Sequence, residues 1–471
     1  MRMTMRIPIL LAAYLTLAAC TTPPEPRPQA APGVVESRLA IGGHVVTPTG
    51  VLRDHWIVIE NGRIAAIQKE RPAGGRALAT SDYVFPGFVD LHNHPMYNVI
   101  PRWRPPHQYA NRYEWRGDPM YRAAIAAPQA EAMKAGFCDI NAYAEVKLLM
   151  GGTTSTIGVS KPSSMPTMDK CIAGLARNLD WHTGFHGAAP GNEPVRNSIG
   201  ITPGDMRDPE PADLSAKLKR GELDLLAIHI AEGRSADPQS RTEFGLLESR
   251  GLLTGRTAII HGIALGKDEF AKMAAAGAAL VWSPRSNMAL YGETADVLGA
   301  IDGKVRVAIA PDWGPSGSDN LLDELAFASS LMRARMDAKR TIGNRQLFEM
   351  ATKTPAEIAR VDKEVGSLAP GLRADLFLLK STNADAYNAL VQTGASAITL
   401  VLVDGVPVYG DASNMSALNV ARTEAVRVCG IAKAINADSL TAGPLAEVAQ
   451  RLGTVLSANG SALAPLVELC R

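Results

Sequence analysis

The central part of the chain alternates short apolar runs with helical stretches, and several runs end in a side chain that can do chemistry. His229, His261 and Asp312 each come at the end of such a run. Alternation of buried strands with helices is typical of βα units that build a parallel sheet. Polar residues at the carboxyl ends of these strands are what the active site of a β/α barrel requires. We therefore expect these three side chains to meet.

The spacing of the units predicts an α/β fold, a (β/α)8 TIM-like barrel over residues 84–364. A closed barrel of this type needs eight strands. Seven are legible, and 195–201 is the candidate for the missing fourth. The expected strands are 84–92, 152–159, 181–187, 224–231, 256–262, 277–283 and 305–311, with helices at 139–150, 212–221, 267–276 and 319–336.

Further strand-like sequence flanks the barrel segment. Between 37 and 83, short strands and an Asn61-Gly62 turn indicate a β-meander, since Asn-Gly is a strong hairpin signal. Similar stretches return at 374–380 and 397–409. From 411 to 471 the pattern predicts helices packed outside the barrel.

The first residues have the features of a secretory signal. Arg2 and Arg6 precede an apolar stretch, 7–19, that is shorter than the ~20 residues of a spanning helix. It ends in a sequence that resembles a bacterial lipobox, which predicts a lipoprotein signal peptide at 1–19 and a lipidated Cys20. A Pro-rich tether follows to residue 36. An ordinary signal peptide that happens to contain a cysteine is the alternative.

We thus expect an exported protein that touches the membrane only through its lipid anchor. Thr21 in place of Asp after the lipidated cysteine favours the outer membrane over the inner one. Export also places the remaining cysteines, Cys138, Cys171, Cys429 and Cys470, in an oxidising compartment. No CxxC pair occurs among them, so a thiolate metal site is disfavoured.

Four cysteines allow three disulfide connectivities. Cys138 and Cys171 begin the helices on either side of the second barrel strand, and the N-termini of neighbouring barrel helices lie close together. This favours a pair 138–171, which leaves 429–470 to tie the C-terminal tail to the preceding helix.

The overall charge excludes one class of partner. Lys and Arg number 48 against 47 Asp and Glu, a formal charge of +1, so the chain has no basic footprint for nucleic acid. No G-x-S-x-G stretch is present, which disfavours a serine-nucleophile hydrolase. No feature of the sequence indicates an oligomeric state.

Two histidines stand at the end of the first expected barrel strand. Residues i and i+2 of a strand share a face, so His92 and His94 can both point to the barrel mouth and bind one metal ion. An HxH pair alone is weak evidence. The polar residues at later strand ends, His229 with Glu232, His261 and Asp312, make a shared site a better explanation than independent coincidences.

These motifs together resemble the amidohydrolase superfamily over about 37–409. The matching pieces are PGFVDLHNH, HIAEG, His261-Gly262, WSPRSN, the strand ending in Asp312 and GSLAPGLRADLFLL. The spacing of His229 and Glu232 is most similar to mononuclear deaminases, such as those of cytosine and guanine, and to triazine hydrolases. The resemblance implies a small composite β-sandwich domain made from 37–83 and 365–410.

The resemblance also implies roles for the residues. His92, His94, His229 and Asp312 are similar to the ligands of one divalent ion, zinc, with iron as the alternative. Such an ion lowers the pKa of a bound water to about 7. Asp312 would accept a proton from that water, Glu232 would carry a proton to the leaving nitrogen, and His261 would polarise the substrate or stabilise an oxyanion.

The implied activity is hydrolysis of a non-peptide C–N bond, as in an amidase, cyclic amidase or deaminase. A dinuclear dipeptidase or prolidase-like enzyme is the alternative, although no lysine closes the fourth strand as a bridging ligand. A non-catalytic, lipid-anchored binding protein is a third hypothesis. Glu232 speaks against it, because binding alone needs no proton shuttle.

A long segment after His94, residues 101–122, is rich in arginine and aromatic residues. Following the first barrel strand, it should emerge at the catalytic face, where long loops usually serve function. We expect a small-molecule substrate with an anionic group; the alternative is a solvated lid whose arginines stack on its own rings. The expected substrate contacts are Arg102, Trp103, Arg104 and Trp115, with Ser286, Asn287 and Trp313 from later loops.

Overall fold

The computed structural model describes residues 38–159, 171, 175–180, 195–198, 202–207, 209–334 and 340–470. The predicted signal peptide, Cys20, the tether and the strand predicted at 181–187 lie outside these ranges. Within them, no helix has the length and apolar character needed to cross a membrane.

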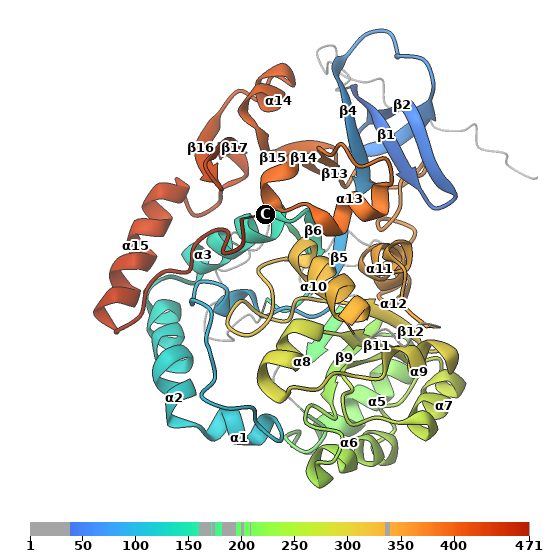
Figure 1. Cartoon of the computed structure of the whole chain (residues 1–471), viewed down its shortest axis with the longest axis vertical. Helices are drawn as coiled ribbons and strands as arrows, with labels where there is room; N and C mark the ends of the chain where they lie inside the picture. The colour runs from blue at the N-terminus through green and yellow to red at the C-terminus, as the bar shows by residue number, and fades with distance from the viewer. Residues whose placement is uncertain are drawn as a thin grey trace, which may run out of the picture. The chain divides into compact units, whose positions relative to one another are not determined.

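Two parallel sheets contain the strands that the structure describes between 88 and 309 (Figure 1); the sequence does not predict β7 among them. One has five strands in the order β12-β11-β10-β9-β8, and the other has three in the order β5-β6-β7. Asn93 and Asp312 form an isolated parallel bridge between the segments that follow β5 and β12. The strands are β5 (Phe88–Asp90), β6 (Thr153–Thr156), β7 (Arg177–Asn178), β8 (Val195–Ser198), β9 (Leu225–Ile230), β10 (Thr257–His261), β11 (Ala279–Trp282) and β12 (Arg306–Ile309).

Most of the predicted strands are confirmed, including 195–201, which contains β8. Residues 84–86 are an exception, because they belong to β4 of another sheet rather than to the first parallel strand. Every residue of β9 is buried, as expected for a strand covered on both faces. Leu225 and Ala227 join one core cluster and Leu226 and Ile228 another, so the strand has two apolar faces.

Helices follow the parallel strands along the chain and surround β9, β11 and β12 in Figure 1. The long helix α3 (Ala127–Met150) begins well before the predicted 139–150 and has a kink at Gly136 (φ −180°, ψ 93°). The others of this region are α5 (Glu210–Arg220), α6 (Pro238–Ser249), α7 (Lys267–Ala276), α8 (Pro284–Tyr291), α9 (Val297–Asp302), α10 (Leu321–Ala334), α11 (Asn344–Ala351) and α12 (Lys353–Ile358).

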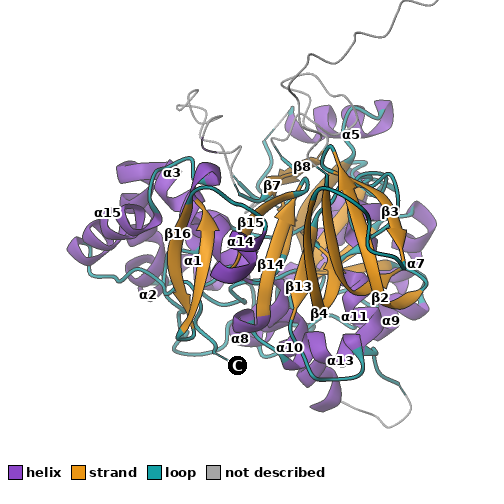
Figure 2. Cartoon of the chain, turned by 90° about the horizontal axis from the view of Figure 1, so that it is seen from above, coloured by secondary structure: helices purple, strands orange, loops and turns teal. Residues whose placement is uncertain are grey.

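The two flanks of the chain combine in a nine-stranded sheet of order β16-β17-β15-β14-β13-β4-β1-β2-β3. They meet where β4 pairs antiparallel with β13, side by side in Figure 2. Asn61 and Gly62, at φ 52° and 75°, form the expected turn between β2 and β3. The strands are β1 (Leu39–Thr47), β2 (Gly50–Glu60), β3 (Arg63–Gln68), β4 (Arg76–Pro86), β13 (Leu376–Leu379), β14 (Ile398–Val403), β15 (Val406–Asp411), β16 (Thr423–Val428) and β17 (Ile431–Asn436).

The C-terminal part differs from the prediction of helices over 411–471. Helices α14 (Ala412–Ala417) and α15 (Leu445–Ala458) are present, but β16 and β17 form a hairpin between them, so the prediction is wrong for 423–436. Cys429 and Gly430 both have positive φ, 50° and 80°. Two left-handed residues are what a tight hairpin turn needs, and Cys-Gly is a less familiar signal for it than Asn-Gly.

Two disulfides join Cys138 to Cys171 and Cys429 to Cys470, which are the expected pairs. Cys138 lies two residues beyond the kink in α3 rather than at the start of that helix. Cys429 lies in the β16–β17 turn, so the second bridge ties the tail to a hairpin and not to a helix. The expected partners are therefore right, although the element assigned to Cys429 is wrong.

The tail after α15 contacts the segments that follow β5 and β12. Its Ala464 N–H donates to Val99 O at 2.9 Å, and the Arg102 Nε donates to Glu468 Oε2 at 2.6 Å. The Glu468 N–H donates to Asp319 Oδ2 at 2.9 Å. The Cys429–Cys470 bridge thus closes a strap over both segments.

Breaking this bridge should destabilise the protein. A disulfide that closes a loop of this length limits the unfolded chain, so Cys470→Ser should lower the free energy of unfolding by about 2–4 kcal/mol. Urea denaturation of the oxidised protein measures the change. Thiol titration should find one new free thiol, that of Cys429, and an unchanged midpoint would contradict the strap's role.

A second prediction concerns Asp404, which lies in a network of charges between the sheets. It accepts hydrogen bonds from Arg177 and Arg373, both at 2.7 Å. Burial raises the pKa of Asp404, but the two guanidiniums outweigh burial and lower this pKa from 3.8 to about 2. Because folding favours the carboxylate, Asp404 stabilises the protein above pH ~4, and this stabilisation disappears as the pH falls towards 2.

Asp404→Asn should therefore cost about 1–3 kcal/mol at pH 7, the range for a lost charged hydrogen-bond partner. The gap between the two proteins should close between about pH 4 and pH 2. Urea midpoints measured across that range test it, and a gap that is independent of pH would show that the charge of Asp404 is not the cause.

Candidate active site

Six potential metal ligands or proton carriers come together at the carboxyl ends of the parallel strands: His92, His94, His229, Glu232, His261 and Asp312. His229 lies in β9 on the same face as Leu225 and Ala227. His92 and His94 follow β5, and the loop after β12 is fixed to them: the His94 N–H donates to Asp312 O at 2.8 Å, and the Asp312 N–H donates to His92 O at 3.1 Å.

His261 reaches the site through its backbone conformation. In β10, Ala258 and Ile260 face the core cluster that Leu225 and Ala227 share, so a regular pleat would turn the next residue away. His261 has φ 66°, in the left-handed region, which redirects its side chain. Asp312 also has a positive φ, 70°. Such strain persists where the surrounding structure enforces it, typically at functional sites.

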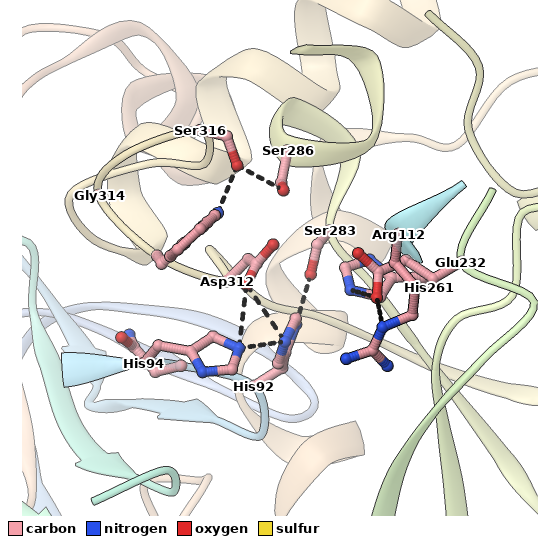
Figure 3. Close-up of polar contacts among 12 residues, drawn as sticks. His92, His94, Arg112, Glu232, His261, Ser283, Ser286, Asp312, Gly314 and Ser316 are labelled. Atoms are coloured by element: carbon pink, nitrogen blue, oxygen red, sulfur yellow. Dashed lines mark hydrogen bonds and ion pairs between the residues drawn. The ribbon is translucent and has the colours of Figure 1, made fainter. Parts of the chain in front are cut away.

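Three donor atoms form a triangle suited to a metal ion (Figure 3). His92 Nε2 and His94 Nε2 are 3.3 Å apart, and each is 3.3 Å from Asp312 Oδ1. Ligands of a tetrahedral zinc ion with bonds of ~2.0–2.1 Å lie roughly 3.3 Å from each other. Donor atoms of His92, His229 and His261 also lie within 4.8 Å of one another. Three of the four predicted ligands, His92, His94 and Asp312, therefore have the spacing that a divalent metal requires, and His229 groups with His92 and His261.

The protonation of the histidines fits the same ion. Burial lowers the pKa of His92, His94 and His229, so all three are neutral imidazoles, the form that binds metal. Nδ1 of His229 is buried without a hydrogen-bond partner. Burial also raises the pKa of Asp312 well above its ordinary value. A cation among these groups would stabilise the carboxylate that burial disfavours.

Other side chains orient the histidines and Asp312. The His92 Nδ1 and Ser283 Oγ are 2.9 Å apart. His261 Nδ1 donates to Asn287 Oδ1 at 2.8 Å, and the Asn287 amide donates to Thr294 Oγ1 at 3.1 Å. Ser286 Oγ and Ser316 Oγ are 2.9 Å apart, and the Ser286 hydroxyl partly offsets the rise that burial causes in the pKa of Asp312. Ser286 and Asn287, which we expect to contact substrate, are both fully buried and contact other side chains of the site.

Glu232 stands beside His261 and Arg112 (Figure 3). Its Oε1 accepts a hydrogen bond from Tyr291 Oη at 2.7 Å, and Trp115 Nε1 donates to the same hydroxyl at 2.7 Å. Its Oε2 is 3.7 Å from His261 Nε2 and 3.5 Å from Arg112 Nε, and has no hydrogen-bond partner. One carboxylate oxygen is therefore held in place while the other remains open to the site.

A cavity of about 430 Å³ adjoins these groups and has a mostly aromatic and apolar wall. Its floor contains His94, His229, Glu232, His261 and Asp312. The remaining described lining residues are Met96, Tyr97, Arg112, Trp115, Arg116, Tyr121, Gln129, Met133, Gly158, Leu290 and Trp313. The volume suits a small molecule, and the flat rings suit a planar one.

Only part of the expected substrate set lines this cavity. Trp115 and Trp313 do, and their ring centroids are 5.6 Å apart. Trp103 instead packs on Tyr109 beneath the wall. Arg102 is held by Glu468 and the Gly317 carbonyl, and Arg104 is exposed away from the lining. These three side chains are therefore outside the described lining, since the segment folds back on the tail and on its own rings.

The cavity's cations are instead Arg112 and Arg116, one turn apart on α1 (Arg112–Gly117). Both belong to the arginine-rich segment 101–122, although neither is among the substrate contacts expected from it. The spacing of four residues within a short helix capped by Asn111 is the signal that would have placed them on one face.

Comparisons with known proteins agree with this geometry. The model of the amidohydrolase family matches residues 83–408. A 5-methylthioadenosine/S-adenosylhomocysteine deaminase of Desulforudis audaxviator is 26% identical over 390 residues, which cover 74% of this chain and 88% of that protein.

Solved structures of the same fold include two deaminases. A zinc-bound adenosine deaminase from Xanthomonas campestris has a TM-score of 0.62 and 20% identity, with coverage of 78% of this chain and 92% of the other. Guanine deaminase of E. coli has a TM-score of 0.63 and 17% identity, with coverage of 79% and 99%. At these identities the likeness establishes the fold.

The donor triangle leads to a direct prediction. Purified protein should retain a divalent metal through dialysis, and His92→Ala or His229→Ala should remove most of it, because each variant deletes a donor atom. His107→Ala, which changes an exposed histidine outside the cavity lining, should retain it. Elemental analysis of the dialysed proteins gives the result. Equal metal in all four proteins would place the ion elsewhere.

Proposed function

Because this chain belongs to the amidohydrolase family, and is a metal-dependent hydrolase of C–N bonds other than peptide bonds, we propose that it deaminates a planar, amino-substituted nitrogen heterocycle. The observation that carries the proposal is the meeting of the His92–His94–Asp312 triangle with the open oxygen of Glu232 at the floor of an aromatic cavity. Deaminases among the relatives support the same reaction.

We propose one zinc ion as the cofactor, held by His92, His94, His229 and Asp312. When bound, the ion would activate a water molecule near neutral pH and polarise the substrate. The described cavity lining contains no lysine, which argues against the dinuclear, dipeptidase-like alternative. Two tightly held ions per chain would overturn the mononuclear proposal.

The chain's own residues would then move the protons. Asp312 lies against His92 and His94 and would accept a proton from the attacking water. Glu232, steadied by Tyr291, would deliver a proton to the leaving nitrogen through its open Oε2. His261 donates through Nδ1 to Asn287, so in its neutral form Nε2 carries no proton. His261 would therefore act as a donor to the substrate only after taking up a proton.

The finer architecture is also proposed. We infer that the two parallel sheets are parts of one closed (β/α)8 barrel. The Asn93–Asp312 bridge joins one pair of edges, and the other pair, β7 and β8, adjoins residues outside the described ranges. The nine-stranded sheet supports a composite β-sandwich domain formed by the two flanks.

The cellular location remains our proposal from the N-terminal sequence. We propose an exported lipoprotein, anchored through Cys20 and facing the periplasm, with the outer membrane preferred. Two disulfides in the described part of the chain suit an oxidising compartment.

An ammonia-release assay tests the proposed reaction. The zinc-loaded protein should release ammonia from at least one amino-substituted purine, pyrimidine, pterin or triazine. Glu232→Gln should reduce kcat by 100-fold or more, within the ~10²–10⁴-fold range of general acid–base catalysis. It should retain the metal, since Glu232 is not a proposed ligand. Hydrolysis of dipeptides or simple lactams without any deamination would refute the assignment.

A further inference from the structure

Arg112 is a buried cation with incomplete partners. Its side chain is 2% exposed, and its Nε and Nη1 are buried without a hydrogen-bond partner. The carboxylate oxygen nearest to it, Glu232 Oε2, is 3.5 Å from Nε and is also without a hydrogen bond. A buried charge is costly unless it is paired and hydrogen-bonded. Arg112 Nε and Nη1 can therefore donate hydrogen bonds to an acceptor that the described part of the chain does not provide.

The position of Arg112 is fixed by the segment that follows β9. Its backbone N–H donates to Glu232 O at 3.1 Å. The preceding residue, Asn111, bridges to Gly233, and the Arg234 N–H donates to Ala110 O at 2.7 Å. Asn111 also caps the helix that Arg112 begins. The guanidinium is thus set beside the proton-carrying carboxylate before any ligand arrives.

Arg112 and Glu232 form a complementary pair on the cavity lining. The open Oε2 of Glu232 can accept from, or give a proton to, a ring nitrogen. A guanidinium can only donate, so its partner must be an acceptor atom. Since the two groups are 3.5 Å apart, that acceptor belongs to the part of the substrate next to the nitrogen that Glu232 serves.

Arg116 has a different environment. Its side chain is 44% exposed and pairs with Asp205 at 3.4 Å. It lies one turn further along α1, nearer to solvent than Arg112. A distant anionic group of a ligand would meet Arg116, whereas Arg112 can meet only a group on the reacting ring.

We propose that Arg112 binds an oxygen atom carried by the reacting heterocycle, either a ring carbonyl or a carboxylate attached directly to the ring. This inference rests on the proposed deaminase function and names its substrate class: oxo- or carboxy-substituted amino-heterocycles. An amino group in place of that oxygen would place its N–H donors against the N–H donors of Arg112, so we expect such a compound to bind poorly.

Matched purines provide the test on the full, zinc-loaded protein. Guanine, 2-aminopurine and 2,6-diaminopurine carry the same 2-amino group and have oxygen, hydrogen or an amino group at C6; guanine also carries a proton on N1, which the other two lack. Cytosine and 4-aminopyrimidine form a second pair. We expect kcat/KM, or affinity in equilibrium dialysis where turnover is absent, to favour the oxo compound by about 10- to 100-fold, which corresponds to one charged hydrogen bond.

Arg112→Gln should reduce this preference to near unity. Arg122→Gln removes the same charge from an exposed residue outside the described lining and should keep the preference. A purely structural role of Arg112 would lower the values for all compounds equally and leave the ratio unchanged. A 2-aminopurine with a carboxylate at the position of the guanine oxygen distinguishes the two oxygen sources.

The outcomes separate the two proposals. If no oxygen-bearing compound is preferred in turnover or in binding by the wild type, or if Arg112→Gln keeps the preference, the Arg112 assignment is wrong while deamination can stand. Selective binding of the oxo compounds without ammonia from any substrate would support Arg112 and overturn the deaminase function.

Discussion

The site depends on one constraint: the ends of β5 and β12 are held in register. The His94 N–H donates to the Asp312 carbonyl and the Asp312 N–H donates to that of His92, so the three predicted ligands share a short backbone ladder. Side chains with several free rotors would lose much entropy if each were positioned alone. Here the ladder fixes their Cα atoms, and the equal spacing of the donor atoms follows from it.

The loops around this ladder are braced from regions distant in sequence. Asp319, in the segment after Asp312, pairs with the fully buried Lys147 of α3 at 3.0 Å and accepts from Glu468 of the tail. Lys147 also donates to the Asn98 carbonyl, which lies in the segment after His94. The two segments that carry the ligands therefore share supports, and the disulfide to Cys470 closes the tail over both. Segments that are distant in the sequence therefore support the site together.

The sequence predicts well those features that depend only on residues close together along the chain. The ligand positions follow buried runs whose pattern is contiguous, and alternation along a strand is enough to align His229 with its neighbours. His261 lies at a strand end for the same reason, but only its left-handed backbone turns it inward. The prediction of helices over 423–436 is wrong, because the Cys-Gly turn is only a weak sequence signal for the β16–β17 hairpin. The contact of Asn287 with His261 depends on tertiary structure, so no local pattern predicts it.

The arginines of segment 101–122 also show which features the sequence alone does not predict. No local feature of the sequence distinguishes Arg112 from Arg102. In the structure Glu468 of the tail pairs with Arg102, whereas the Arg112 N–H donates to the carbonyl of Glu232 in the segment after β9. Elsewhere this chain pairs its buried cations: Lys433 donates to two carbonyls and to Asp411, and Arg177 binds Asp375 and Asp404. Arg112 also has a partner, Glu232 Oε2 at 3.5 Å, but its Nε and Nη1 and that oxygen form no hydrogen bond. Open donors and an open acceptor there cost stability, which selection tolerates where a ligand completes them.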